Sequence, residues 1–509
     1  MAEYLSPGVY VEEFDSGIKP MDGVSTSTAG FVGMTARGPL TGVPQFVGSF
    51  AEFQRVFGGY LPKEIYGQRR FLPMAVEQFF ANGGSRCFVM RLLDGSGAQA
   101  SAADLGALKI TASSVGAWGD SIRAACKKSP VNDKLCNLLV SSPEFEESYE
   151  NVSLDPKSDG YLVRLLEKSL LVRAEYTPAE EVPDLYSLFP GSEEDKKNGN
   201  WATVALTGGC DCAEGENPAE KINAAVLKGT DGGPNRRSGL CAMKDVTEVS
   251  IVVCPGVTDP AEVQEIVTHC AEMENRVCIL DMPSGMNQVT DLQQYRAQFD
   301  SSFAAMYHPW VQVFETLEKK SVYMPPSGTM AGVYARTDTE RGVHKAPANE
   351  VLRNCTGLET VFGKPEQDML NPVGVNLIRN IQGLGIRVWG ARTCSSDPSW
   401  KYVSVRRLFI YIEETIRRNT GWAVFEPNDQ LLWTKVRGSI ASFLGTLWRN
   451  GALMGATEAE AYFVNIGKGS TMTQDDILNG RLVCVIGVAP VRPAEFVIFR
   501  ITQIMEQNG

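Results

Sequence analysis

The feature that most constrains the fold of this 509-residue chain is an apolar segment close to its C-terminal end. Within residues 494–505, apolar side chains fall on both faces of an extended chain, and most of them are β-branched or aromatic. This pattern predicts a strand that is buried inside a sheet. Only four residues follow the segment. Its backbone N–H and C=O groups therefore need a partner strand from earlier in the chain or from another molecule.

The opposite end of the chain carries a second strand-like segment. The run from Pro7 to Phe14 begins with proline, which cannot donate a hydrogen bond to a sheet and therefore suits an edge strand. Two strand-forming ends on one chain indicate strand exchange between subunits. The residues that we expect to exchange are Pro7, Gly8, Val9, Tyr10 and Val11 at the first end, and Glu495, Phe496, Val497, Ile498, Phe499 and Ile501 at the second.

Composition and charge argue against several classes of protein. Hydrophobic residues make up 43% of the chain and charged residues 21%, which is typical of a globular protein with several domains. A net charge of -12 without a basic face argues against binding to nucleic acid. No apolar run approaches the roughly 18 residues of a membrane span, and the first residues lack the pattern of a signal peptide. We therefore expect neither membrane insertion nor export by the Sec route.

The cysteines indicate a reducing compartment. Most of the 12 cysteines stand singly in apolar runs, as buried thiols do in proteins that fold in the cytoplasm. Cys210 and Cys212 are close in sequence, but a metal ion would need two further ligands, and no CxxC or HxxxH spacing supplies them. The sequence therefore predicts thiols in a polar loop, with neither a metal nor a cofactor.

Periodicity predicts alternating strands and helices before residue 94. A small-residue strand at 28–34 is followed by a short helix capped by Ser49, a longer helix at 71–82 and a strand at 87–92. This order indicates α/β packing.

Residues 94–246 have a different character. Their strand-like pieces are short and lie between acidic loops, which indicates a single insertion of mostly β structure. A glycine-rich loop at 229–233 has no strand before it and no helix N-terminus close behind it. We therefore predict a turn there, and not a phosphate-binding loop.

Residues 247–324 show a βαβαβ pattern, which predicts a parallel sheet with right-handed crossovers. The predicted elements are a strand at 249–254, a helix that opens at Asp259, a strand at 276–281, a helix at 289–299 and a strand at 310–314. Asp281 ends the second strand, where α/β enzymes keep catalytic groups. Because no glycine fingerprint and no second titratable partner accompany it, a capping or loop-closing role is the better prediction.

Two amphipathic helices are predicted in the last third of the chain, near a strand at 386–393. The first, at 403–419, has one apolar face and two expected ion pairs one turn apart. Its apolar face is Val405, Leu408, Ile412 and Ile416, and its pairs are Glu413 with Arg417 and Glu414 with Arg418. The second helix is predicted to be capped by Asn428 and to bury Leu432, Val436, Ile440, Phe443 and Leu447.

The predicted fold class is mixed α+β, with an α/β core built from both ends of the chain. The predicted division is an N-terminal arm at 1–20, the N-terminal part of the core at 21–93, an inserted, mostly β outer domain at 94–246, an α/β domain at 247–345, a C-terminal core domain at 346–490 and a C-terminal arm strand at 491–509.

Several ordered motifs resemble the contractile tail sheath protein of phages and phage-like injection particles. They are Ala348-Asn349, Leu370-Asn371-Pro372, Trp389-Gly390-Ala391-Arg392-Thr393, Val405-Arg406-Arg407-Leu408, Phe425-Glu426-Pro427-Asn428-Asp429 and Arg492-Pro493-Ala494-Glu495-Phe496, together with the N-terminal run from Ser6 to Glu13. The resemblance is dense at 325–505 and at 4–92. It is weak in the insertion, where such sheaths vary.

The resemblance implies a structural protein that has no cofactor. In such sheaths the two arms add strands to a sheet in neighbouring subunits and so link stacked six-subunit rings around an inner tube. Contraction then drives the tube through a target envelope without nucleotide hydrolysis. The implied partners are further copies of the chain, an inner tube protein, and baseplate and terminal cap proteins. Assembly in the bacterial cytoplasm into a phage tail or phage-like particle is also implied.

Arginines in the C-terminal helices are candidates for contact with the tube or with neighbouring subunits. They are Arg406, Arg407, Arg417, Arg418, Arg437 and Arg449. An ordinary solvated helix face explains any one of them equally well.

Two other classes of function stay open on the residues alone. An α/β hydrolase or nucleotide enzyme could use the βαβαβ unit, but the chain has no G-x-S-x-G elbow, and Pro365 follows Gly363-Lys364 where a P-loop needs Ser or Thr. The three histidines, His269, His308 and His344, offer little for acid-base chemistry. A static shell protein would share the strand exchange but would need no second, contracted state.

Overall fold

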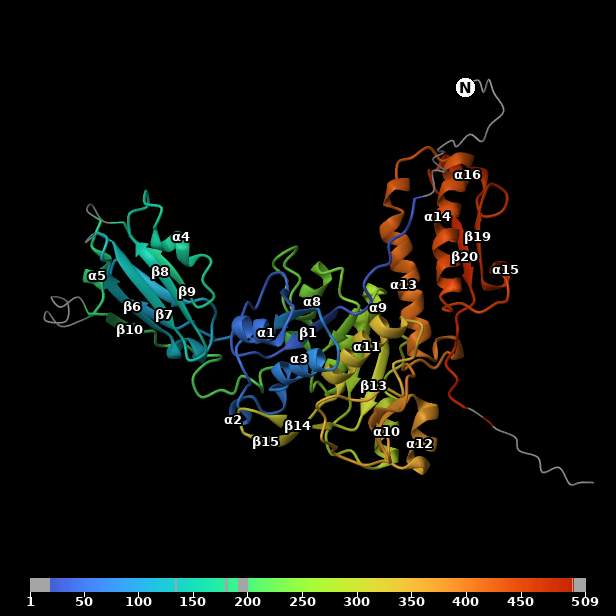
Figure 1. Cartoon of the computed structure of the whole chain (residues 1–509), viewed down its shortest axis with the longest axis horizontal. Coiled ribbons are helices and arrows are strands. Elements are labelled where there is room, and N and C mark those ends of the chain that lie inside the picture. Colours follow the sequence, from blue (N-terminus) through green and yellow to red (C-terminus); the bar gives the residue numbers. More distant parts are fainter. Residues whose placement is uncertain (1–18, 133–134, 179–181, 191–199, 497, 499–509) are drawn as a thin grey trace, which may run out of the picture. The chain divides into compact units, whose positions relative to one another are not determined.

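The computed structural model of the chain describes residues 19–132, 135–178, 182–190, 200–496 and 498. They form two compact units (Figure 1). One unit consists of residues 25–403, and the other combines residues 19–24 with the chain from residue 404.

An eight-stranded sheet organises the larger unit, with the strand order β18-β17-β13-β12-β11-β1-β3-β2. The inner strands run parallel, and the edge strands β18 and β2 run antiparallel to their neighbours. Strands from before and after the insertion meet where β1 pairs with β11. The bounds are β1 Ala29–Gly33, β2 Gln45–Val47, β3 Cys87–Arg91, β11 Ile251–Val253, β12 Val277–Asp281, β13 Ala304–His308, β17 Val375–Ile381 and β18 Gly385–Val388.

Helices cover both faces of this sheet, because successive strand residues point to opposite sides. On one face, alternate strand residues such as Val32 share a hydrophobic cluster with α8, α9 and α10. On the other face, α3 and α11 pack on the intervening residues: the rings of Phe31 and Phe79 meet edge to face, and the hydroxyls of Tyr307 and Tyr334 are 2.8 Å apart. The bounds are α1 Phe50–Phe57, α2 Lys63–Tyr66, α3 Leu72–Ala81, α7 Ala224–Lys228, α8 Gly239–Ala242, α9 Pro260–Met273, α10 Val289–Arg296, α11 Ser327–Arg341 and α12 Lys364–Leu370.

Two glycines allow α11 to pack closely on α3. A Cβ atom on Gly328 or Gly332 would lie 2.5 Å from the backbone oxygen of Ala75 or Phe79, respectively. Because backbone atoms cannot move aside as a flexible side chain can, any larger residue would force the two helices apart.

The βαβαβ pattern is confirmed, although its third strand was assigned to the wrong residues. β11, β12 and β13 lie side by side and parallel, with α9 and α10 between them in sequence. The third strand is therefore β13, whereas the predicted strand at 310–314 is β14 (Val311–Glu315), which pairs with β15 (Lys320–Met324) and with β16 (Gly357–Leu358) in a separate antiparallel sheet. The alanines of β13 give a weak strand signal, and Pro309, which has no N–H, separates the two strands.

The insertion is mostly β, as predicted, and has a hydrophobic core of its own. Two antiparallel sheets, with orders β10-β6-β7-β8 and β4-β5-β9, enclose buried residues from Ala103 to Leu206. Buried residues from Ile222 to Val246 belong instead to the cluster under the main sheet, so this separate core ends well before residue 246. The bounds are β4 Ala102–Asp104, β5 Leu108–Ala112, β6 Arg123–Lys128, β7 Cys136–Ser141, β8 Glu146–Val152, α4 Leu162–Leu166, β9 Val172–Tyr176, α5 Leu185–Leu188 and β10 Ala202–Ala205.

The smaller unit is built on the two predicted amphipathic helices, α13 (Val403–Asn419) and α14 (Gln430–Arg449). The predicted apolar stripe of α14 is buried at every position: Leu432, Val436, Ile440, Phe443 and Leu447. The ring of Tyr411 on α13 lies 5.9 Å from that of Phe443, between centroids. Helical periodicity therefore predicted both helices and the buried face of α14.

The predicted cap of α14 was wrong by one residue. Asp429 caps the helix, because its carboxylate accepts a hydrogen bond from the N–H of Leu432 (2.9 Å). Asn428 instead accepts from the indole N–H of Trp433 (2.7 Å) and donates to the carbonyl of Arg481 (3.0 Å). The side chain of Asn428 is thus engaged in tying the helix start to a distant loop.

Candidate functional site

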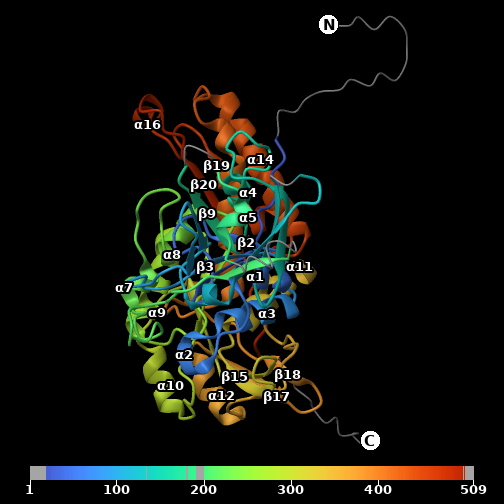
Figure 2. The same cartoon turned by 90° about the vertical axis from the view of Figure 1, so that its left-hand side faces the viewer.

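A small open sheet in the smaller unit is the strongest candidate site. β19 (Tyr462–Ile466) and β20 (Cys484–Val488) pair antiparallel, with Val464 opposite Ile486. The strands lie beside α14 in both views (Figure 1, Figure 2), and Ile466 is 2% exposed. Over the described part of the chain, neither strand pairs with a third. A two-stranded sheet is marginal by itself and leaves two edges that can accept further strands.

The hydrogen-bond pattern identifies the groups that these edges present. The N–H of Ala489 donates to the carbonyl of Ala461 (2.9 Å), just beyond the paired strands. In an antiparallel pair, bonded and non-bonded positions alternate. The N–H and C=O groups of every second residue therefore point away from the partner strand. These residues are Tyr462, Val464 and Ile466 on β19, and Cys484, Ile486 and Val488 on β20.

The two edges are not equally open. Arg437 on α14 donates a guanidinium hydrogen bond to the carbonyl of Ile466, which occupies one acceptor at the end of the β19 edge. Among the hydrogen bonds of the described residues, none involves the outward backbone groups of β20. The β20 edge therefore offers a complete row of donors and acceptors.

The face of the sheet that points away from α14 is partly apolar. Phe463 and Val485 are 50% and 45% exposed. The Phe463 ring lies across Gly487 on the opposite strand, where a Cβ atom would be 2.2 Å from the ring. Glycine at 487 therefore lets the aromatic ring cover the strand.

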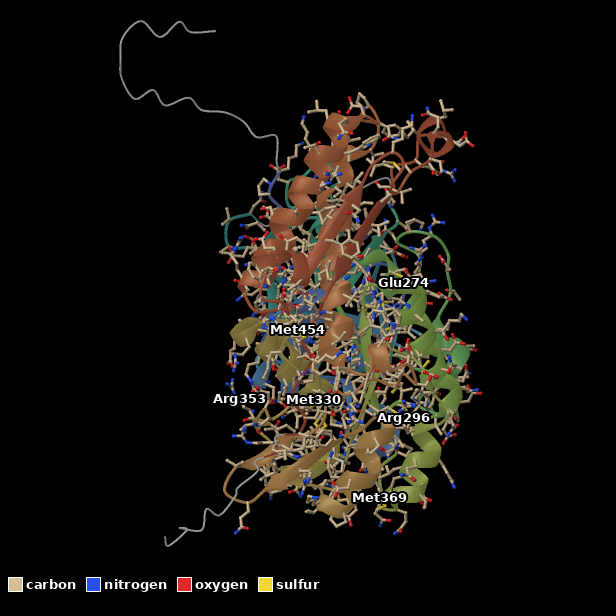
Figure 3. All side chains as sticks on the ribbon, turned by 90° about the vertical axis from the view of Figure 1, so that its right-hand side faces the viewer. Glu274, Arg296, Met330, Arg353, Met369 and Met454 are labelled. Carbon is tan, nitrogen blue, oxygen red and sulfur yellow. The ribbon has the colours of Figure 1, made fainter. Side chains whose placement is uncertain are left out.

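The chain leaves this sheet toward its C-terminal end in an extended form. Residues 489–491 pair with 452–454, at the end of the sheet where Met454 is labelled in Figure 3. Beyond them, Phe496 and Ile498 are 73% and 77% exposed, and residues 491–496 belong to no strand. The other predicted exchange residues except Glu495 lie outside the described residues: Pro7, Gly8, Val9, Tyr10, Val11, Val497, Phe499 and Ile501.

Four of the predicted interface arginines lie on α13, and carboxylates engage Arg406, Arg417 and Arg418 among them. Arg406 and Arg407 are only 8% and 3% exposed, and Arg406 lies 3.7 Å from Glu413. The predicted pair of Glu414 with Arg418 is confirmed at 3.3 Å. The predicted pair of Glu413 with Arg417 was wrong, because Arg417 binds Glu414 at 2.6 Å.

The remaining two arginines lie on α14. Arg437 is exposed and binds the β19 edge, and Arg449 is exposed with Glu458, at the start of α15 (Glu458–Ala461), 3.9 Å away. These two are exposed, as are Arg417 and Arg418 on α13.

Sequence reasoning missed the edge residues of β19 and β20. Their alternating apolar runs, Tyr462-Phe463-Val464-Asn465-Ile466 and Cys484-Val485-Ile486-Gly487-Val488, carried a usable strand signal. The sequence offered no means of telling that, among the described residues, these two strands pair only with each other, because pairing is decided by tertiary packing.

Asp281 has the predicted capping role. Its carboxylate accepts hydrogen bonds from the N–H and hydroxyl of Ser327, at 2.9 and 2.6 Å, where α11 begins, and from the N–H of Gly256 at 3.1 Å. Burial raises the pKa of Asp281 to about 6, although these hydrogen bonds oppose the shift. All of its contacts are structural.

The histidines are held in separate structural positions. Burial and the nearby Arg276 lower the pKa of His269 on α9 to about 3. Burial also lowers the pKa of His308 to about 4, while its Nε2 contacts the carbonyl of Met286 at 2.8 Å. Burial lowers the pKa of His344 as well. Neutral imidazoles, buried at His269 and His308 and half-buried at His344, need no acid-base chemistry to explain their presence.

The other sequence candidates lie in loops. The thiol of Cys210 contacts the carbonyl of Gly97, and that of Cys212 contacts the carbonyl of Glu216, each at 3.2 Å. Within the described ranges no group of three or more His, Cys, Asp or Glu residues could hold a metal ion. The loop at 229–233 leads into a turn at 233–236, where the N–H of Arg236 donates to the carbonyl of Gly233 (3.1 Å), and both end glycines of the loop have positive φ angles. None of the described helices is both long enough and apolar enough to span a membrane.

Comparison with known proteins gives consistent matches. Residues 233–394 match the model of the phage tail sheath protein central domain, and residues 395–504 match that of the phage tail sheath C-terminal domain. The two matches together span more than half of the chain.

Individual relatives agree with these matches. The putative prophage major tail sheath protein of Pseudomonas aeruginosa strain UCBPP-PA14 is 26% identical over 298 residues, which are 56% of this chain and 74% of the relative. The tail sheath protein of Burkholderia phage BcepMu is 27% identical over 259 residues, which are 46% of this chain and 54% of the relative. Among solved structures, the helical sheath of the anti-feeding prophage in its contracted state has a TM-score of 0.58 and 25% identity, over 98% of this chain and 99% of that one.

Proposed function

This chain belongs to the phage tail sheath family, and we propose a mode of assembly for it. It is a structural tail sheath protein of a phage tail or phage-like injection particle rather than an enzyme. Copies stack as hexameric rings around an inner tube, and their N- and C-terminal arms complete the β19–β20 sheet in adjacent copies. The observation that carries the proposal is the pair of open edges on that sheet, in a chain whose two ends are strand-forming.

The open edges match the arms in chemistry and in length. The β20 edge presents outward N–H and C=O groups at Cys484, Ile486 and Val488. One added strand can therefore form up to about six main-chain hydrogen bonds at roughly 1 kcal/mol each. Phe496 and Ile498 alternate with other residues of the C-terminal arm, and each apolar side chain that becomes covered adds about 2 kcal/mol. Such a joint is strong enough to persist while whole subunits move.

Contraction uses two different parts of the subunit, the exchanged strands that join copies and the larger units that move. The exchanged strands keep adjacent copies connected, while the larger units slide and bury more surface against one another. Free energy stored in the extended lattice is released in this way, and the tube advances without nucleotide hydrolysis. Even a few kcal/mol per subunit is a large driving force when many subunits act together. A static shell protein would form the same joints but only one lattice, so electron micrographs of sheaths at two lengths distinguish the two functions.

Peptide binding tests the joint directly. A subunit that lacks residues 1–18 and 495–509 keeps both open edges but cannot donate a strand. We expect it to stay monomeric in light scattering and to bind a labelled peptide of residues 493–505, measured by fluorescence anisotropy. The same peptide with Ile498→Pro is the matched control, because proline removes one donor from the added strand. Normal tubular assembly by the truncated subunit would disprove the proposal.

The exposed arginines are candidates for the tube-facing surface. We assign this role first to Arg417, Arg418, Arg437 and Arg449, because these four residues are exposed. Baseplate and terminal cap proteins are the further partners that we propose for the ends of the stack. Assembly in the bacterial cytoplasm fits the 12 cysteines, none of which is in a disulfide among the described residues.

A further inference from the structure

Residues 19–24 lie along the helices of the smaller unit and are bound there by side chains. The N–H of Asp22 donates to the Asn419 side chain (3.2 Å), and the amide of Asn419 donates back to the carbonyl of Asp22 (2.9 Å). Two residues on, the N–H of Val24 donates to the hydroxyl of Thr415 (3.3 Å). One turn of α13 thus binds the N–H and C=O groups of Asp22 and the N–H group of Val24.

The start of this segment is bound at two further points. The N–H of Lys19 donates to the hydroxyl of Ser439 on α14 (3.1 Å). Its ammonium group lies 4.7 Å from the centre of the Trp422 ring, in the loop between α13 and α14. Ser439 is 1% exposed, so this contact reaches into the buried side of α14.

Close packing accompanies these hydrogen bonds. A Cβ atom on Gly23 would lie 2.1 Å from the hydroxyl oxygen of Tyr411. The backbone at Gly23 therefore lies directly against α13, where a side chain would push it away. Backbone groups of an irregular segment usually form hydrogen bonds with water. Here the side chains of Thr415, Asn419 and Ser439 bind them instead.

We propose that residues 19–24, which we call the N-terminal anchor, are a fixed attachment that sets the reach of the N-terminal arm. Thr415, Asn419 and Ser439 are positioning residues that hold the anchor on its own subunit in every state of the polymer. The residues before the anchor then span the gap to another copy. This inference rests on the strand exchange proposed above.

The anchor limits the separation between joined subunits. Release of the six anchor residues would lengthen the free arm by about 20 Å. With the anchor in place, a short arm can therefore transmit the position of one subunit to the next. Without the anchor, the longer free arm lets the axial distance between joined subunits vary.

Two kinds of variant test the anchor. The release variant Thr415→Val with Asn419→Leu removes the binding groups but keeps the size of the side chains. The slack variant inserts Gly-Ser-Gly between residues 18 and 19 and leaves every anchor contact in place. The matched control is Asp22→Ala, because Asp22 is bound only through its backbone. A lock variant, Val24→Cys with Thr415→Cys, ties the anchor to α13 by a disulfide.

Hydrogen exchange and electron microscopy give the readouts. In the parent and the control, we expect slow exchange at the amides of Lys19, Asp22 and Val24, and a single axial repeat. In the release variant, we expect fast exchange at the amides of Asp22 and Val24 and a broadened distribution of axial repeats. The slack variant should show the same broadened distribution. After an added oxidant closes its disulfide, the lock variant should polymerise and contract as its own reduced form does.

Defined outcomes would overturn the inference. An unchanged repeat in the slack variant would show that arm length does not set subunit spacing, even if the release variant fails to fold. Loss of polymerisation or contraction on oxidation of the lock variant, with both present in its reduced form, would show that the anchor must detach. Failure of the strand exchange itself is recognised separately, by normal polymerisation of a chain that lacks residues 1–18.

Discussion

Single buried residues in this protein serve to hold elements together, and Asp281 shows how. Its carboxylate ties the start of α11 to the loop after β11 through Ser327 and Gly256. A position that would suit a catalytic acid thus serves as a helix cap, where the partial positive charge of a helix N-terminus favours a carboxylate. The energetic cost of its burial appears as the raised pKa.

The raised pKa of Asp281 predicts a specific dependence of stability on pH. Its pKa is about 6 in the folded chain and about 4 in an unfolded chain. The folded state therefore binds the proton more tightly. The stability that protonation contributes is fully present below about pH 4 and is lost as the pH rises through 6. A shift of about two pKa units corresponds to a loss on the order of 3 kcal/mol.

The variant Asp281→Asn cannot titrate at this position. We expect its melting temperature to rise relative to that of the parent between pH 4 and pH 7, as measured by scanning calorimetry. The control is Gln294→Asn, an exposed position on α10, which adds and removes no titratable group, so its difference from the parent should stay flat. A constant difference between Asp281→Asn and the parent across this range would contradict the prediction.

At the scale of elements, the open edges of the β19–β20 sheet allow the most direct test of assembly. Ile486 points its N–H outward, so Ile486→Pro removes a donor from the β20 edge and leaves the hydrogen bonds to β19 in place. We expect polymerisation to fall below detection in electron micrographs, because proline also blocks the approach of an added strand. Ile486→Val is the matched control and should assemble normally.

Loss of an edge must be separated from loss of the sheet. The amides of Phe463 and Val485 lie at bonded positions of the pair. In Ile486→Pro they should keep slow hydrogen exchange, which shows that the two strands still pair. Tubes of normal length from a variant with these protected amides would rule out a role for the β20 edge.

At the scale of the whole molecule, the insertion has a hydrophobic core of its own within the larger unit. Gln99 and Cys210 exchange backbone hydrogen bonds at 2.9 and 3.1 Å, so its two ends are neighbours. Its core, from Ala103 to Leu206, is distinct from the cluster under the main sheet. Contacts such as the ion pair of Arg37 with Glu144 (2.7 Å) join the two without a shared core.

We therefore expect the insertion to be removable. Replacement of residues 100–209 by two glycines should leave a soluble chain that melts cooperatively and still polymerises, as followed by calorimetry and electron microscopy. A longer deletion, to Ile222, is the control and should destabilise the chain, because Ile222 is 4% exposed and packs under the main sheet. Equal damage from both deletions would mean that the insertion is part of the folding core.

The sequence by itself determined those elements that local patterns specify. The spacing of apolar residues predicted α13, α14 and the strands beside α9, and the position of Asp281 after a strand without catalytic partners predicted its capping role. These succeeded because helical and strand periodicity depend on neighbours a few residues away. The cap of α14 and the third parallel strand failed where the local signal was ambiguous, between Asn428 and Asp429 and in the alanines of β13.

Only the tertiary structure decided which backbone N–H and C=O groups lie on open strand edges. Both β19 and β20 look like ordinary strands in sequence, and their free edges follow from having no third strand at either side among the described residues. The anchor of residues 19–24 was equally invisible, because it pairs a polar segment with side chains nearly 400 positions away, 397 in the case of Asp22 and Asn419. Contacts over such separations are set by the packing of whole elements, on which local sequence patterns carry no information.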